Sequence, residues 1–130
     1  FAASLDALEP ALDQRLAAVR DRPFVVFHDA YHYFEAHFGI EAAAAIHVSP
    51  EVQPGAARVA EIQAALRQLD AVCIFAEPQF EPRIVATVSE GVQAKSGVLD
   101  PLGGDVPLGP DAYAGMLTAL TDDLVACLGD

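Results

Sequence analysis

The residues with the clearest chemical potential stand where short apolar runs end. His28 directly follows the apolar residues 24–27, and Asp100 directly follows Val98 and Leu99. Imidazole and carboxylate are two of the groups that ligate zinc, so His28 and Asp100 could supply half of a tetrahedral zinc site. The alternative is a local role for each, with the imidazole lying in a turn and the carboxylate beginning one.

Glu77 is a third candidate at the same kind of position. It ends another apolar segment, which is predicted as a buried strand over residues 71–75. A carboxylate there could hydrogen-bond to a metal ligand and so orient His28, or it could orient a backbone amide. It could equally serve as a cap or turn acceptor for the segment that Pro78 begins. Both roles remain open at the level of the sequence.

The other histidines fit metal chemistry less well. His28 and His32 are four residues apart, but the glutamate of the zinc-protease motif H-E-x-x-H is missing. A metal-dependent hydrolase that uses His28, His32 and Asp100 is an alternative from another class, and it would require His32 beside the same metal. We expect His37 to be a partly exposed helix residue and His47 to be a strand residue.

A parallel sheet would bring the three candidates to one edge. Apolar segments alternate with helical segments along the chain, as in a four-stranded, mainly parallel α/β sheet flanked by helices on both faces. Strands are predicted at 24–27, 45–48, 71–75 and 92–99, and helices at 1–21, 30–38, 54–69, 82–90 and 110–128. Ligands of such sheets bind at the carboxyl ends of the strands, where His28, Glu77 and Asp100 would lie.

Local signals set the expected ends of the first helices. Asp29 is a favourable N-cap for the helix over 30–38, which Gly39 would close. Segment 1–21 carries one apolar stripe with residues three and four apart, formed by Leu5, Leu8, Leu12, Leu16 and Val19. Pro10 falls inside this stripe, so the helix either begins near Pro10 or is kinked there.

The composition favours one domain and excludes some partners. The 130 residues carry 7 basic and 19 acidic side chains, and the net charge of −12 argues against nucleic acid and anionic membrane surfaces. No run approaches the roughly 18 apolar residues of a membrane span. No G-x-G-x-x-G or Walker A motif occurs, and Ser49 lacks a G-x-S-x-G context. The chain begins with Phe1 and shows no signal peptide, so either a signal peptide was cleaved or this is a piece of a longer protein.

The two cysteines, Cys73 and Cys127, do not form a C-x-x-C motif, which excludes a thioredoxin-type site. As a disulfide they would join the last helix to the sheet, and closing such a loop contributes about 4 kcal/mol in the chain-entropy account. Two free, buried thiols are the alternative. A disulfide would indicate an oxidising compartment.

Four motifs follow one another along nearly the whole chain. They are F-H-D-A-Y-x-Y-F at 27–34, P-E-x-Q-P-G at 50–55, C-I-F-A-E-P-Q-F at 73–80 and L-D-P-L-G at 99–103. In this order they resemble the ZnuA-like family, the periplasmic zinc-binding proteins of bacterial ABC importers, which belongs to the cluster A-I or helical-backbone receptors. Each motif alone would be weak, but together they are highly specific.

The resemblance implies a two-lobed receptor of which this chain is one part. Members have two α/β lobes joined by a long rigid helix and bind metal between the lobes. Residues 1–21 would be the end of the linking helix, and residues 22–130 the C-terminal lobe. His28 would be a zinc ligand, and Asp100 would lie at the fourth coordination position, as a direct ligand or beside water or another residue. Cys73 and Cys127 would form a disulfide.

The resemblance also implies a function without catalysis. The protein would capture Zn²⁺ in the periplasm for the membrane permease of an ABC importer, with the ligands of the absent N-terminal lobe completing the site. Manganese-binding relatives tend to carry glutamate in place of His28, and imidazole favours zinc over the harder manganese ion. A manganese or iron receptor of the same family is the first alternative, and an interaction or adhesion domain without metal is another.

Three consequences follow for this chain. It should bind zinc far more weakly than the whole protein, and two copies could dimerise or swap domains through the exposed lobe face. Binding should weaken below about pH 6, because zinc requires the neutral imidazole of His28 and the ionised carboxylate of Asp100.

Overall fold

The computed structural model describes residues 1–46 and 51–129 and confirms the α/β fold class. Its strands are β1 (Phe24–Val26), β2 (Ala44–Ala45), β3 (Cys73–Ala76) and β4 (Lys95–Val98). Its helices are α1 (Ala2–Ala17), α2 (His32–Phe38), α3 (Ala56–Leu69), α4 (Pro82–Ser89) and α5 (Ala112–Leu128). The strands form one sheet in the order β2-β1-β3-β4, and each neighbouring pair is parallel.

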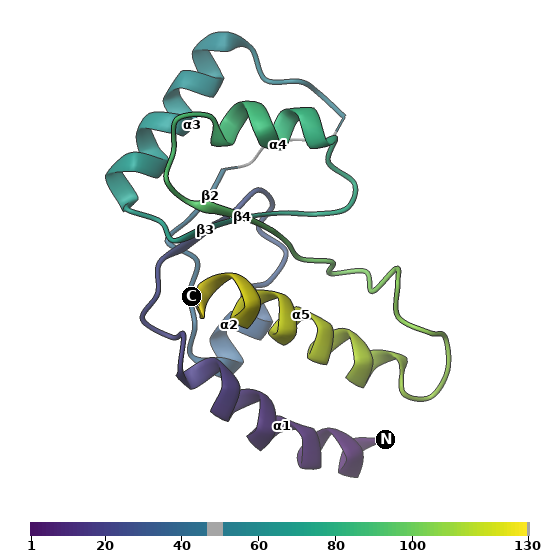
Figure 1. Cartoon of the computed structure of the whole chain (residues 1–130). Coiled ribbons are helices and arrows are strands. Elements are labelled where there is room, and N and C mark those ends of the chain that lie inside the picture. Colours follow the sequence, from purple (N-terminus) through teal and green to yellow (C-terminus); the bar gives the residue numbers. More distant parts are fainter. Residues whose placement is uncertain (47–50, 130) are drawn as a thin grey trace.

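Alternate residues of the central strands face two separate cores. Phe24 and Val26 pack with Leu12, Leu16 and Leu124 in the core beneath α1, α2 and α5. The residues between and beyond them, such as Val25 and Phe27, pack against α3 and α4 in the second core. Figure 1 shows these two helix layers on opposite sides of the sheet. Burial on both faces explains why the central strands β1 and β3 read as continuous apolar runs.

The first helix follows the predicted stripe but is shorter than expected. It spans Ala2–Ala17, with Pro10 inside it and Leu12 and Leu16 buried. Val19 lies beyond the helix end and is buried as well. Pro10 is exposed, so the backbone hydrogen bond that a proline cannot donate is lost at the water-facing side of the helix.

The predicted cap of the second helix is wrong. The helix begins at His32, with Tyr31 in the N-cap position, and not at Ala30. The amide of Ala30 donates instead to the carbonyl of His28 at 3.0 Å, which forms a tight turn directly after β1 and delays the helix. The predicted end is confirmed, because Gly39 follows the helix with a φ of 64°, a conformation that glycine adopts without strain.

The strand boundaries differ from the predictions by one to three residues. Strand β3 covers Cys73–Ala76 where 71–75 was predicted, and β4 covers Lys95–Val98 where 92–99 was predicted. The strand predicted at 45–48 is described only as β2, Ala44–Ala45. Residues 47–50, and with them the predictions for His47 and Ser49, lie outside the described residues.

A disulfide joins Cys73, the first residue of β3, to Cys127 in α5, with their Cα atoms 6.2 Å apart. The pairing that the family resemblance implied is therefore confirmed, and the alternative of free thiols is excluded. The bond fixes the C-terminal helix to the middle of the sheet. Among the described residues, no helix combines the length and apolar character that crossing a membrane requires.

Candidate metal centre

The strand register brings His28 and Glu77 side by side. Val26 and Phe75 are the last residues paired between β1 and β3, and His28 and Glu77 each follow two residues further on. Their side chains are in contact just beyond the paired strand ends. The predicted proximity of these two strand ends is observed.

The side chain of Glu77 contacts one particular nitrogen of His28. The two carboxylate oxygens lie 3.2 and 3.1 Å from Nδ1 of the imidazole ring. The Glu77 side chain is only 9% exposed, whereas the His28 side chain is 61% exposed. The imidazole is thus supported from inside the protein while its ring remains accessible to solvent.

The two roles considered for Glu77 belong to different parts of the residue. Its backbone carbonyl accepts a hydrogen bond from the amide of Phe80 at 3.0 Å, which forms the turn after β3. Its side chain is therefore not required for that turn and faces His28 instead. Phe80 also packs edge-on against Phe27, with ring centroids 5.1 Å apart, and this contact holds the ends of β1 and β3 together.

Asp100 organises the turn that follows β4. One carboxylate oxygen accepts the amide of Leu102 at 3.0 Å, and the other accepts the amide of Gly104 at 2.6 Å. The local role considered for this aspartate is therefore present. Each carboxylate oxygen has a second lone pair, so these hydrogen bonds leave acceptor positions for a cation.

Tyr31 lies between the ends of β1 and β4 and was not singled out from the sequence. It is buried, and its hydroxyl donates to the carbonyl of Leu99 at 3.4 Å. Burial raises the pKa of the Tyr31 hydroxyl above its ordinary value, and the charges of Glu77, Asp100 and Glu35 raise this pKa further. The phenol therefore stays protonated amid three carboxylates, two of which are candidate site residues.

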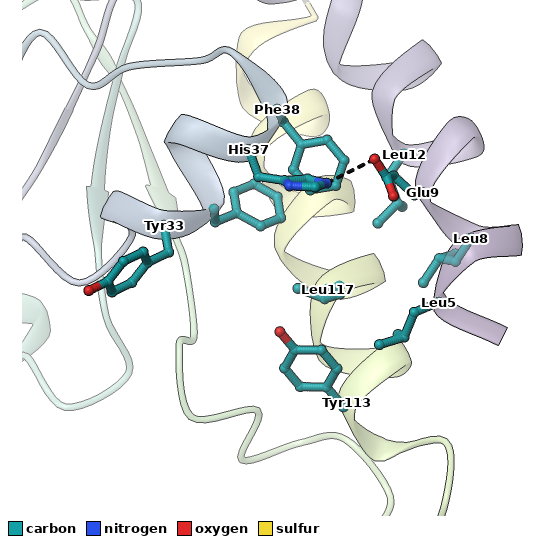
Figure 2. A pocket seen from close by; sticks show the side chains of 10 residues that line it. Leu5, Leu8, Glu9, Leu12, Tyr33, His37, Phe38, Tyr113 and Leu117 are labelled. Atoms are coloured by element: carbon teal, nitrogen blue, oxygen red, sulfur yellow. Dashed lines mark ion pairs between the residues drawn. The ribbon is translucent and has the colours of Figure 1, made fainter. Parts of the chain in front are cut away.

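His32 and His37 lie elsewhere. His32 is exposed, with its ring centroid 5.7 Å from that of Tyr33. His37 forms an ion pair through Nε2 with Glu9 at 3.0 Å. Figure 2 shows this pair between α2 and α1. An apolar pocket of about 370 Å³ lies beside the pair and is also lined by residues of α5. That pocket lining does not include any of the three candidate site residues.

The described residues do not assemble a complete metal site. Within 1–46 and 51–129, no group of three or more His, Cys, Asp or Glu side chains is arranged to hold a metal ion. The cluster of His28, His32 and Asp100 that a hydrolase would need is therefore not formed.

The chain has the fold of a class of proteins that includes ZnuA-like domains. It resembles the laminin-binding adhesin Lmb of Streptococcus agalactiae with a TM-score of 0.74 at 29% identity, covering 97% of this chain and 47% of that one. It resembles the Zn(II)-bound ZnuA-like domain of Streptococcus pneumoniae AdcA with a TM-score of 0.73 at 24% identity, covering 98% and 49%. The second likeness supports the fold alone.

Within that class the chain belongs to the ZnuA family. The family model described as zinc-uptake complex component A, periplasmic, matches residues 1–127. The chain is 49% identical over 128 residues to the high-affinity zinc uptake system protein ZnuA of Brucella abortus (strain 2308) and 45% identical over 113 residues to that of Yersinia pestis. These matches cover 98% and 87% of this chain, but only 38% and 36% of the relatives.

Proposed function

We propose that this chain supplies one half of the zinc site of a periplasmic receptor that captures Zn²⁺ for the membrane permease of an ABC importer. His28 and Asp100 are its metal ligands in this proposal. The observation that carries it is the contact between the buried Glu77 carboxylate and Nδ1 of the exposed His28 ring. Histidine ligands of metals regularly have such a carboxylate behind them.

The ligand chemistry favours zinc. Imidazole nitrogen and carboxylate oxygen both suit Zn²⁺, whereas manganese prefers oxygen ligands. Two ligands from this chain leave two positions of a tetrahedron for the other lobe. Support for this division comes from the relatives, which carry the name of a zinc uptake protein and of whose length this chain spans little more than a third.

The remaining features fit a periplasmic receptor. In the proposal, α1 is the end of the linking helix and residues 22–130 are the C-terminal lobe. The Cys73–Cys127 disulfide suits an oxidising compartment. The net charge of −12 is unfavourable for nucleic acid, and capture followed by release to a permease requires no catalytic group.

Zinc calorimetry on the full-length protein containing this chain tests the proposal. We expect tight binding that His28→Ala weakens strongly, and competition in which zinc displaces manganese. The isolated chain should bind zinc weakly and lose that binding in His28→Ala. Full affinity in the full-length His28→Ala variant would overturn the proposal.

Tight binding by the isolated chain would mean that two copies complete one site. Analytical ultracentrifugation with and without zinc separates this case, because a shared site makes the dimer depend on the metal. A monomer that binds zinc weakly is the outcome that the division between two lobes requires.

A further inference from the structure

The contact between Glu77 and His28 restricts where the imidazole can carry its proton. A neutral imidazole has one N–H, on either Nδ1 or Nε2, and the other nitrogen has a lone pair. An ionised carboxylate can only accept hydrogen bonds. Both Glu77 oxygens lie within 3.2 Å of Nδ1, so a hydrogen bond exists here only when Nδ1 carries the proton.

The burial of Glu77 makes this preference strong. A carboxylate that is 9% exposed has lost most of its hydration and is stabilised by a protein donor. The neighbouring hydroxyl of Tyr31 donates elsewhere, to the carbonyl of Leu99. If the His28 proton moved to Nε2, the lone pair of Nδ1 would face a buried negative charge, which is unfavourable.

We infer that Glu77 is a positioning residue that fixes His28 in the tautomer with the proton on Nδ1 and thereby presents the lone pair of Nε2 to the metal. The metal part of this inference rests on the proposed function, in which His28 is a ligand. The tautomer part does not, because it concerns the metal-free protein.

The surrounding structure holds both groups in place. His28 and Glu77 each lie two residues beyond the last pair of β1 and β3, and the amide of Phe27 donates to the carbonyl of Phe75 at 2.9 Å just before them. The edge-on packing of Phe27 against Phe80 closes the two strand ends from the opposite face. Glu77 therefore directly follows β3, and the packing of the two strand ends holds its carboxylate in place.

The chain contains a matched control in the ion pair of Glu9 and His37. Its distance of 3.0 Å resembles that of the buried pair, but both side chains are about half exposed. Glu9 also faces Nε2 rather than Nδ1. The same substitution can be made in both pairs, so a general effect of removing a carboxylate charge is separated from an effect on His28.

The first experiment reads the tautomer directly. Nitrogen-15 NMR of the imidazole rings in the metal-free chain, at about pH 8, shows which ring nitrogen carries the proton. We expect Nδ1–H for His28, a mixture of tautomers in Glu77→Gln, whose amide can accept or donate, and Nδ1–H again in Glu77→Asp. Glu9→Gln should leave the His28 signals unchanged. A His28 proton on Nε2, or no response to Glu77→Gln, would overturn the inference.

The second experiment measures zinc affinity in the full-length protein. Glu77→Gln should weaken binding by about 10- to 100-fold, the range typical of groups that orient a metal-ligating histidine. Glu77→Asp should recover part of that loss, and Glu9→Gln should have no effect. If the tautomer changes while Glu77→Gln leaves zinc affinity unaltered, the link to the metal is overturned. If His28→Ala also binds zinc fully, the proposed function itself has failed.

Discussion

Two histidine–carboxylate pairs in this protein have nearly the same contact distance but different surroundings. Nδ1 of His28 lies 3.1 Å from Glu77, and Nε2 of His37 lies 3.0 Å from Glu9. The carboxylate of Glu77 is 9% exposed, and that of Glu9 is 52% exposed. Distance alone therefore does not distinguish a candidate site from an ordinary surface ion pair.

The distinguishing features are burial and the choice of ring nitrogen. The pair of His37 and Glu9 links two helices in contact with water, where such pairs contribute at most about 1 kcal/mol. Its Nε2 atom is already engaged by the carboxylate. In the other pair the carboxylate is inside the protein and takes Nδ1, so the second nitrogen of His28 is left for a ligand.

The largest expected effect separates the two histidines by zinc affinity. His28→Ala should weaken zinc binding by the full-length protein at least about a hundredfold, since even groups behind a ligand contribute 10- to 100-fold. His37→Ala should leave the affinity unchanged within error. Calorimetry under identical conditions measures both. Equal losses in the two variants would remove the distinction between the pairs.

Acid should reveal the same difference. Zinc competes with protons for its ligands, so affinity should fall on the order of tenfold between about pH 7.5 and pH 5. His37→Ala should show the same fall as the unaltered protein, because its imidazole is outside the proposed site. If the pH dependence of zinc affinity disappeared in His37→Ala, protonation of His37 would be its cause, and the prediction would be wrong.

A third test concerns the packing of the sheet that carries Glu77. A methyl group on Gly97 in β4 would lie 2.6 Å from a ring carbon of Phe75, whereas nothing lies within 4 Å of the same group on Gly55. Gly97→Ala should lower the free energy of unfolding by about 1–3 kcal/mol, the usual result of overpacking a core. Gly55→Ala is the control, with a change within about 0.5 kcal/mol. Chemical denaturation measures both variants. Equal stability of Gly97→Ala and Gly55→Ala would contradict the prediction and indicate a loosely packed sheet.

The smallest effect concerns Asp123, a carboxylate for which the described contacts include no histidine. Partial burial raises its pKa above the ordinary value, and the charges of Asp122 and Asp100 raise it further. The folded protein therefore holds this proton more tightly than the unfolded chain, and stability is lost as the pH rises through the folded pKa. Asp123→Asn should raise the melting temperature slightly at about pH 7.

The control for that variant is the same measurement in acid. At about pH 3 the carboxyl group is protonated in both states, so Asp123→Asn should give no gain there. A gain of equal size at both pH values would assign the effect to something other than charge. The difference between the two pH values gives the effect of the Asp123 charge on stability, for a carboxylate with no histidine among its described contacts.

The placing of His28 and Glu77 at one edge of the sheet could be predicted from the sequence, because it depends on the alternation of apolar and helical segments. Continuous apolar runs separated by helices require a parallel sheet, and a parallel sheet places His28 and Glu77 at the same edge. The contact with Nδ1 depends on register, rotamer and burial together, which the sequence leaves open. The predicted ends of β1 and β4 lie one residue too far because hydrophobicity continues beyond the last strand residue, as at Leu99.

The missed features have local causes. Asp29 has the right side chain for a cap, but the turn from His28 to Ala30 competes with the helix start. In the sequence, Tyr31 is one of several aromatic residues in its motif. Its hydrogen bond to the carbonyl of Leu99 depends on the fold, which brings the two residues together. Its place within a polar motif that follows a strand was the available signal.

The disulfide between Cys73 and Cys127 turns part of the chain into a covalent ring with a sequence separation of 54 residues. Glu77 and Asp100 are inside this ring, and His28 is on the tail outside it. A protease cut in the loop over residues 101–109 would therefore leave two pieces that migrate together until a reductant is added. A cut between His28 and Cys73 would instead divide the polypeptide between His28 and both carboxylates, leaving only noncovalent contacts to keep them together.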